Sequence, residues 1–256
     1  EKVPYGTWIV REIESPKGYV LSEEEIAVTI GKVDEVVEIE LVNYFIKGNI
    51  ALTKVDEDYP DNKLSGAVFE VYSDTNGDGK LDKDDTLLGE MKELDGGVYQ
   101  MSELRYGKYL VKETKAPTGF VLDEDVYAVS IEENGKTYTV ENKAGVGFIN
   151  AAQKGSLKIV KTSSDGKVEG FSFRVTGVDY DQTFKTDKNG EIVIEGLRIG
   201  DYTVSEVSDK ASAGYILPAD KQATVKVNAT AIVQMHNEFR DTPKTGDDFN
   251  LGLWVS

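Results

Sequence analysis

The chain has 256 residues, with 46 acidic and 29 basic side chains, one histidine and no cysteine, which gives a formal charge of −17. This acidic excess repels phosphate backbones and anionic lipid surfaces, so nucleic acid is excluded as a partner. The absence of cysteine excludes disulfides and thiolate metal sites, and the single His236 excludes multi-histidine metal centres. No apolar run is long enough to span a membrane and no signal peptide opens the sequence. We expect the chain to begin inside a longer protein.

One pattern occurs three times, with a glycine, a spacer, an aromatic residue and then a valine two residues before a glutamate. It reads VPYGTWIVRE at 3–12, LRYGKYLVKE at 104–113 and LRIGDYTVSE at 197–206. A second block follows each copy, and reads SPKGYVL at 15–21, APTGFVL at 116–122 and ASAGYIL at 211–217. The repeat is far too long for a solenoid and has the length of a small domain.

Alternating apolar and polar residues between these blocks predict β-strands, and no stretch keeps a helical period for more than about two turns. The predicted tight turns are NGK at 134–136 and KNGE at 188–191. Several short strands per repeat indicate an all-β chain of tandem Ig-like β-sandwich domains, which short linkers would hold as a rod-like array. The alternating runs include 27–42, 67–73, 127–142, 191–196 and 223–235.

The repeat sets the predicted domain boundaries. Residues 1–47 correspond to the second half of a domain whose first strands are missing, and we call them domain A. Residues 48–152 form a complete domain B, and residues 153–239 form domain C. Residues 240–256 are a tail.

Three kinds of polar residue fall on the apolar faces of predicted strands, since residues two apart share a face. A glutamate follows an aromatic residue and a valine in every repeat, a lysine ends the apolar face of the opening strand in domains B and C, and an asparagine ends that of each closing strand. These residues are Glu12, Glu113 and Glu206; Lys54 and Lys161; and Asn43, Asn150 and Asn237. Lys158 and His236 lie on the opposite faces, and we expect His236 at the surface.

Burying an unpaired polar group in a core costs free energy, and three hypotheses explain how these residues avoid it. The strands could fray so that each group reaches solvent. Alternatively, a buried Lys–Glu pair could hydrogen-bond to the asparagine. The third reading is covalent: burial favours a neutral amine and a protonated carboxyl, and the amine can then attack the asparagine carbonyl while the glutamate relays protons.

These residues resemble the Cna B-type (prealbumin-like) domains of Gram-positive pilins and adhesins, and the segment YLVKETKAPTGF at 109–120 is similar to their glutamate motif. The resemblance implies a prealbumin-like fold with a Lys–Asn isopeptide bond between the first and last strands, promoted by glutamate. It implies Lys54–Asn150 with Glu113 in domain B, and Lys161–Asn237 with Glu206 in domain C. Domain C departs from the motif at Ala213. Domain A keeps Glu12 and Asn43, and no suitable lysine precedes Glu12.

The segment DTNGDGKLDKDD at 74–85 matches the spacing of a twelve-residue EF-hand-type loop, with an aspartate in place of the final glutamate. We expect a structural Ca²⁺ ion there and no organic cofactor. The alternative is an acidic turn that only solvates a sheet edge. The predicted ligands are Asp74, Asn76, Asp78, Lys80 through its carbonyl, Asp82 and Asp85.

The tail sequence DTPKTGDD at 241–248 resembles a sortase sorting signal, with threonine in place of the usual leucine. The resemblance implies cleavage after Thr245 and linkage to peptidoglycan or to a pilin subunit. The alternative is an ordinary linker. The motif residues are Thr242, Pro243, Lys244, Thr245 and Gly246.

The sequence therefore predicts a non-enzymatic stalk of an extracellular, cell-wall-anchored Gram-positive surface protein or pilin, whose partners are sortase and peptidoglycan or pilin subunits. Its only chemistry is the single-turnover formation of the internal bonds. Two other functions stay open. One of the domains could bind host matrix or a glycan, or the array could anchor a secreted enzyme. A host or surface ligand could also bind to a region upstream of Glu1.

Overall fold

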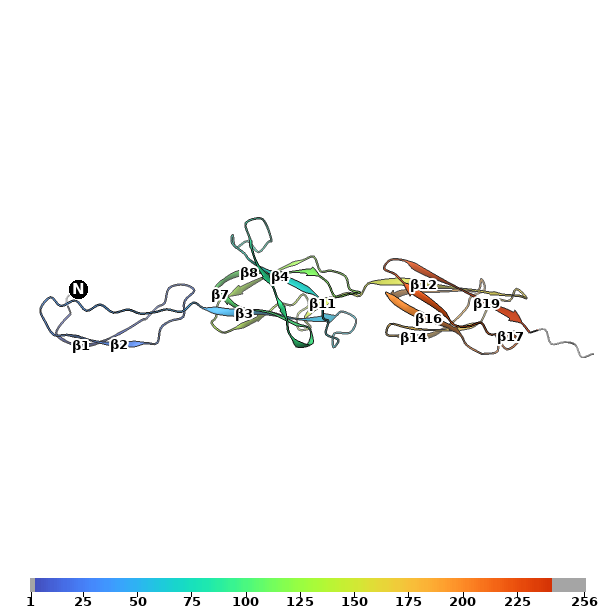
Figure 1. Ribbon diagram of the computed structural model, residues 1–256, viewed down its shortest axis with the longest axis horizontal. Coiled ribbons are helices and arrows are strands. Elements are labelled where there is room, and N and C mark those ends of the chain that lie inside the picture. Colours follow the sequence, from blue (N-terminus) through green and yellow to red (C-terminus); the bar gives the residue numbers. More distant parts are fainter. Residues whose placement is uncertain (1–2, 241–256) are drawn as a thin grey trace, which may run out of the picture. The chain divides into compact units, whose positions relative to one another are not determined.

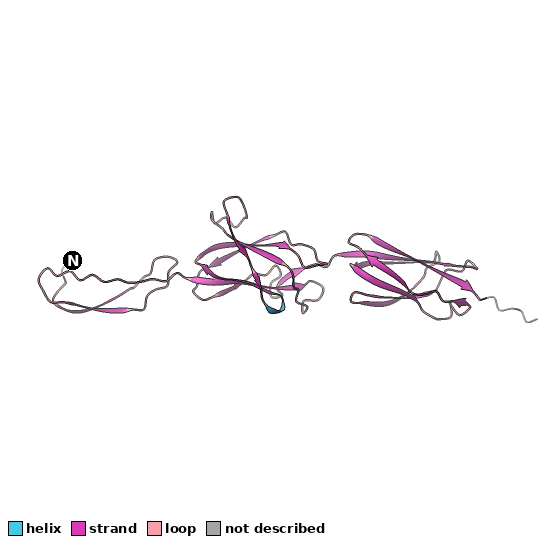
Figure 2. Ribbon diagram, viewed as in Figure 1, coloured by secondary structure: helices cyan, strands magenta, loops and turns pink. Residues whose placement is uncertain are grey.

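The chain consists almost entirely of β-strands, as the alternating runs predict (Figures 1 and 2). The computed structural model describes residues 3–240, and within them the one helical segment is the short 3-10 turn η1 (Asp95–Gly97). Over the same residues, no helix has the length and apolarity needed to cross a bilayer. The chain divides into two compact units, one ending at Ala152 and the other beginning at Gln153. The predicted all-β class is confirmed, and the rod-like arrangement stays a prediction.

Domain A contains one antiparallel pair, β1 (Gly6–Arg11) and β2 (Glu25–Ile30). The predicted strand over 27–42 is wrong beyond Ile30, because residues 31–42 have no strand pairing. In domains B and C the closing strand pairs with the opening strand of the same domain. Domain A offers no such partner within residues 3–46, so the alternating pattern alone does not make its closing segment a strand.

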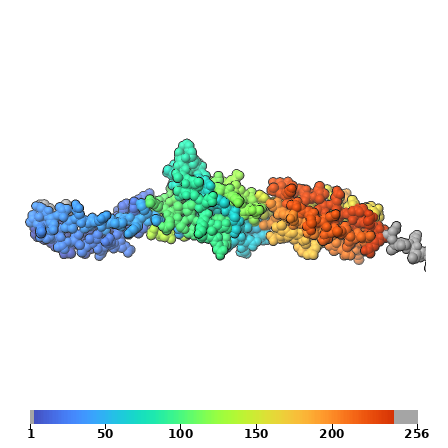
Figure 3. All heavy atoms as spheres, in the orientation of Figure 1, coloured from blue at the N-terminus to red at the C-terminus, as the bar shows by residue number. Residues whose placement is uncertain are grey.

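Domain B is a sandwich of two sheets, with strand order β10-β3-β7-β6 in one, where β11 also pairs with β3, and β5-β4-β8-β9 in the other. The 74–85 segment connects β4 to β5 and protrudes as the teal projection in Figure 3. The strands are β3 (Lys47–Asp56), β4 (Val68–Ser73), β5 (Thr86–Glu90), β6 (Lys92–Glu93), β7 (Val98–Arg105), β8 (Gly107–Lys115), β9 (Val126–Ile131), β10 (Thr137–Thr139) and β11 (Phe148–Asn150).

Domain C repeats this arrangement, with the sheets β15-β12-β19-β17 and β14-β13-β16-β18. In both domains the first strand lies between an antiparallel neighbour and the parallel last strand. The strands are β12 (Lys154–Ser163), β13 (Ser172–Gly177), β14 (Tyr180–Lys185), β15 (Glu191–Arg198), β16 (Gly200–Glu206), β17 (Tyr215–Ile216), β18 (Lys221–Val225) and β19 (Thr230–Phe239).

The two predicted turns form and carry the chain from one sheet to the other. Gly135, at φ 76°, separates β9 from β10, and Gly190, at φ 77°, separates β14 from β15. Each flanking pair of strands belongs to different sheets. The left-handed backbone conformation at both positions explains the glycine.

A glycine near the start of each opening strand lets another backbone segment approach closely. A Cβ on Gly155 would lie 2.2 Å from the Lys226 carbonyl oxygen, and a Cβ on Gly48 would lie 2.8 Å from that of Lys136. Both glycines precede a shift in strand register. The repeated glycine in GNIALTK and GSLKIVK therefore serves packing between strands.

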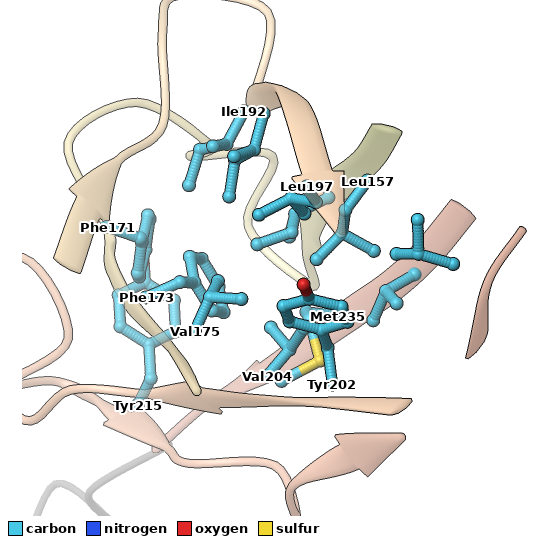
Figure 4. Packing of buried hydrophobic residues seen from close by; sticks show 14 residues of the cluster. Leu157, Phe171, Phe173, Val175, Ile192, Leu197, Tyr202, Val204, Tyr215 and Met235 are labelled. Atoms are coloured by element: carbon cyan, nitrogen blue, oxygen red, sulfur yellow. The ribbon is translucent and has the colours of Figure 1, made fainter. Parts of the chain in front are cut away.

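Each sandwich encloses its own apolar core. In domain C, Phe171 and Phe173 lie against Tyr215 and Val175, and Tyr202 packs beneath Leu157 and Leu197 (Figure 4). In domain B, Phe69 packs edge-to-face against both Tyr99 and Phe148, with ring centroids 5.1 and 4.9 Å away. The aromatic residue of the repeat is thus a core residue in domains B and C, whereas Trp8 in domain A is 40% exposed.

We predict that Phe173→Ala lowers the free energy of unfolding of domain C by about 3–5 kcal/mol, because the fully buried ring leaves a cavity. Urea unfolding, followed by far-ultraviolet circular dichroism, measures the change in the free energy of unfolding. The control is Val193→Ala on β15, whose side chain is 55% exposed and whose loss should cost less than about 0.5 kcal/mol. Equal effects of the two substitutions would contradict the assigned core.

Candidate functional site

The lysines of the two opening strands lie inside the sandwiches. Lys54 is 0% exposed and Lys161 is 1% exposed, because each shares its face with two apolar residues of the core. Lys158 is on the other face of β12 and pairs with Glu191 at 2.7 Å. The alternative in which the strands fray and release these lysines to solvent is therefore wrong for domains B and C.

The parallel pairing of first and last strands brings an asparagine to each lysine. Lys54 is opposite Phe148, and Lys161 is opposite Met235, so that Asn150 and Asn237 lie two residues further along the same face. Diagonal neighbours on one face of a sheet are within reach of long side chains. The two domains thus present the lysine and the asparagine in the same register, although their sequences differ at most other positions.

In domain B the third member, Glu113, lies on β8 in the opposite sheet and is 0% exposed. The Asn150 Nδ2 group donates to Glu113 Oε2 at 2.9 Å and to Oε1 at 3.1 Å. The Asp123 backbone N–H donates to Oε2 at 2.9 Å, and Lys54 Nζ donates to the Phe148 carbonyl oxygen at 3.0 Å. Among the described residues, no donor reaches the buried Oδ1 atom of Asn150.

In domain C, Asn237 Nδ2 donates to Glu206 Oε1 at 2.7 Å. Lys161 Nζ donates to the Thr162 carbonyl oxygen at 2.5 Å and lies 4.2 Å from the centroid of the Phe171 ring. Two buried oxygens, Glu206 Oε2 and Asn237 Oδ1, have no hydrogen-bond partner among residues 3–240. The domain C cluster is therefore less completely hydrogen-bonded than that of domain B.

Domain A has the glutamate and the asparagine of the cluster. Asn43 Nδ2 donates to Glu12 Oε2 at 2.7 Å, and the Ser22 backbone N–H donates to the same oxygen at 2.7 Å. Both side chains are only half-buried. Glu12 therefore accepts one hydrogen bond from a side-chain amide and one from a backbone N–H.

Burial changes the acidity of the cluster. Desolvation lowers the pKa of Lys54 from 10.5 to about 8 and also lowers the pKa of Lys161. Desolvation raises the pKa values of Glu113 and Glu206, although hydrogen bonds to the carboxylates and the nearby lysines oppose the shift. Both changes favour a neutral amine beside a neutral carboxyl group, which is the protonation state that amide formation requires.

The 74–85 segment is organised by its own side chains. Asp74 is 7% exposed, and its carboxylate accepts hydrogen bonds from the backbone N–H groups of Gly77 and Gly79 at 2.7 and 3.1 Å. Asp85 accepts from Thr75 and Asp82. Within residues 3–240, no three Asp, Glu, His or Cys side chains converge on one point that could hold a metal. The calcium site stays a prediction.

Two other expectations concern the C-terminal part of the chain. His236 is exposed, as predicted, and contacts Thr162 and Glu238. The predicted sorting motif, Thr242 to Gly246, lies outside the described residues.

Sequence reasoning missed a polar network behind Glu113. The Asp123 carboxylate accepts hydrogen bonds from Asn142 Nδ2 and Tyr127 Oη, both at 2.7 Å, and it acts electrostatically on Lys54. Asn142 also bonds both backbone groups of Ile149, next to Asn150. The sequence did contain a pointer to Asp123, because this residue directly follows the repeated block APTGFVL.

Domains B and C are therefore tandem β-sandwich domains, each with a buried lysine, glutamate and asparagine where its first and last strands pair. The SpaA prealbumin-like fold domain family matches residues 1–44, 48–144 and 155–239, and the chain belongs to this family. No curated protein matches the chain.

Among solved structures, the Bacillus anthracis TIE protein is 27% identical with a TM-score of 0.70. The match covers 93% of this chain and 42% of that one, so this chain spans less than half of its length. A streptococcal ancillary pilin is 18% identical with a TM-score of 0.33, covering 94% of this chain and 77% of the pilin. The Streptococcus agalactiae minor pilin GBS52 has the same identity and TM-score, covering 78% of this chain and 98% of the pilin.

We predict that a Glu113→Gln chain, in which Lys54 stays a free amine, becomes more stable as the pH rises from 8 to 9.5. The folded pKa of Lys54 is about 8 with Glu113 present, and loss of that carboxylate, which raises it, leaves it lower still. The unfolded value is 10.5, so the unfolded state of the variant binds more protons in this window. The free energy of unfolding should rise by at most about 1.4 kcal/mol per pH unit. Urea unfolding at the two pH values measures it.

The control is the double variant Lys54→Met with Glu113→Gln, which keeps the apolar stem and removes the titrating amine. Its stability should change less across the same window. Parallel pH profiles of the single and double variants would contradict a depressed Lys54 pKa.

Proposed function

We propose that the chain is a structural stalk of a Gram-positive surface protein or pilin, and that domains B and C each close one Lys–Asn isopeptide bond. The carrying observation is the same buried cluster of lysine, glutamate and asparagine in both sandwiches. An ion pair alone is a weak source of stability in a core, since desolvation offsets its attraction. A covalent product removes the lysine charge from the core, and burial favours the neutral form of the glutamate that stays behind.

The proposed reaction needs only the three side chains. The neutral Nζ of Lys54 attacks Cγ of Asn150, the new Cγ–Nζ bond forms, and the Cγ–Nδ2 bond breaks. Glu113 donates a proton to the asparagine carbonyl oxygen and takes one from the attacking amine. It passes the amine proton to Nδ2, which leaves as ammonia, and it recovers its own proton when the hydroxyl group of the tetrahedral intermediate becomes a carbonyl again. Lys161, Glu206 and Asn237 perform the same steps in domain C.

The position of the bond suits a protein that carries tension. The linked strands are the first and last of the domain, and they run parallel, so a pull on the two ends of a domain shears one past the other. A bond between them carries the force before the sheet hydrogen bonds do. It also closes a loop of nearly the whole domain, which by analogy with a disulfide stabilises by roughly 4 kcal/mol.

The surface location rests on the sequence and on family membership. The DTPKTGDD tail is the segment that a sortase would recognise and join to peptidoglycan or to a pilin subunit. Domain B or C could still present a ligand-binding surface, and an enzyme could precede the array. The stalk function is favoured because the cluster is internal and requires no external ligand.

We predict that the intact mass of the purified chain lies about 34 Da below the sequence mass, because each bond releases one ammonia of about 17 Da. Lys54→Met and Lys161→Met should each restore about 17 Da after the substitution is accounted for. Tryptic mapping should recover the Lys54–Asn150 and Lys161–Asn237 crosslinked peptides.

The matched control is Lys158→Met on the opposite face of β12, which should leave the mass deficit unchanged. An unshifted intact mass of the parent chain would falsify the covalent reading and leave a buried ion pair in each domain.

We further propose a structural Ca²⁺ ion at the 74–85 segment. Its oxygen donors follow the spacing of an EF-hand loop, and Gly79, at φ 75°, stands at the position that the turn requires. Asp74, Asn76, Asp78, Asp82, Asp85 and the Lys80 carbonyl would hold the ion. It would neutralise an acidic projection between β4 and β5.

Calorimetric titration of the EDTA-treated chain should detect one Ca²⁺ site. Asp78→Asn should weaken binding at least about 10-fold, because it removes a charged ligand. Asp84→Asn removes the same charge at a position outside the ligand pattern and should change affinity less than about 3-fold. Absence of binding heat in the parent chain would contradict the proposal.

A further inference from the structure

One position near the cluster differs between the three repeats in its ability to donate a hydrogen bond. The segment after the glutamate reads GYVLS in domain A, GFVLD in domain B and GYILP in domain C. The residue after the leucine is therefore Ser22, Asp123 or Pro218. Proline has no backbone N–H.

The three segments occupy equivalent places in the fold. Val20 and Val121 donate their backbone N–H groups to Tyr44 and Ala151, the residues that follow Asn43 and Asn150. In domain C, Ile216 pairs in the same way with Glu238, which follows Asn237. The alignment of Pro218 with Ser22 and Asp123 therefore rests on strand pairing as well as on sequence.

This position determines whether the glutamate receives a backbone hydrogen bond. The N–H of Ser22 donates to Glu12 Oε2 at 2.7 Å, and that of Asp123 donates to Glu113 Oε2 at 2.9 Å. In domain C the corresponding oxygen, Glu206 Oε2, is buried and has no partner among residues 3–240. The missing donor is the N–H that Pro218 lacks.

We propose that Pro218 is a positioning residue that keeps Glu206 a neutral acid, whereas the backbone N–H of Asp123 holds Glu113 closer to its carboxylate form. A buried carboxylate oxygen without a donor is costly, and a bound proton removes that cost. Hydrogen bonds to a charged group are stronger than those to a neutral one, so the N–H favours the ionised state.

The charged groups that face the two glutamates are of the same kinds. Glu206 faces Lys161 from β12 and Asp209 from the loop after β16, and Glu113 faces Lys54 from β3 and Asp123 from the loop after β8. Each site thus has one lysine and one aspartate. The two sites differ in their hydrogen bonds: Glu113 receives the backbone N–H of Asp123 and two contacts from Asn150 Nδ2, whereas Glu206 receives one contact from Asn237 Nδ2. The backbone donor is the only one of these contacts that comes from a different residue.

The consequence for the proposed reaction is a domain-specific pH range. In domain C, Glu206 already carries the proton that the reaction needs, and Lys161 supplies the neutral amine. The Asn237 amide, whose Nδ2 group donates to Glu206 Oε1 in this structure, must turn over to present its carbonyl oxygen to that acid. In domain B the same state requires Glu113 to gain a proton against its backbone hydrogen bond. This consequence rests on the proposed function, whereas the protonation state of Glu206 does not.

The test is the carboxyl titration of Glu206 by carbon-13 NMR in the full chain carrying Lys161→Met, which cannot form the bond. The resonance is assigned with Glu206→Gln. Adding Pro218→Ala restores a backbone N–H, and we expect it to lower the pKa of Glu206 by about one unit or more, since one hydrogen bond to a charged group is involved. A midpoint that stays unchanged or rises overturns the inference.

Domain B provides the reciprocal test, which remains available if the Pro218→Ala substitution prevents domain C from folding. In a Lys54→Met chain, Asp123→Ala keeps the N–H and Asp123→Pro removes it, and both lose the carboxylate. We expect a higher Glu113 pKa in the proline variant than in the alanine variant, and equal values overturn the inference. Because neither chain forms a bond in the titrated domain, a failed mass test of the isopeptide bonds leaves this result intact.

Discussion

The burial of a lysine amine between the first and last strands of a sandwich is the constraint on which the rest of the structure depends. Lys54 and Lys161 are enclosed by apolar residues of their own strands and by the aromatic rings of Phe148 and Phe171. An ammonium ion in such a place is costly, so its pKa falls. The surrounding groups must then provide either a counter-charge or a covalent partner.

The glutamate is the available counter-charge, and the asparagine is the covalent partner that we propose. They reach the lysine because the parallel register places Asn150 and Asn237 two residues beyond the residue opposite the lysine. The same burial that lowers the pKa of the amine raises that of the glutamate, so a single physical cause favours the protonation states of the proposed reaction. In domain A the glutamate and the asparagine still hydrogen-bond to each other without a lysine, and the Glu12–Asn43 pair is only half-buried.

Domains B and C differ in the hydrogen bonds that their buried glutamates accept. Glu113 is held by Asn150 and Asp123, with a second layer of Tyr127 and Asn142. Glu206 is held by Asn237 alone, since Pro218 offers no N–H. Two domains with the same three reactive side chains can therefore differ in the proton affinity of the carboxyl group between them.

The sequence by itself determined the all-β class and the repeat, because strand alternation and the glycine-aromatic blocks are local. It also placed Lys54, Glu113 and Asn150 and their domain C equivalents on core-like faces, since alternation fixes the side on which each residue lies. It could not show that these faces meet, because that depends on pairing between strands nearly a whole domain apart in the chain. For the same reason it predicted a strand over 27–42, whereas the strand in the structure ends at Ile30. It also missed the donor role of Asp123, whose N–H lies within hydrogen-bond distance of Glu113 only in the folded sandwich.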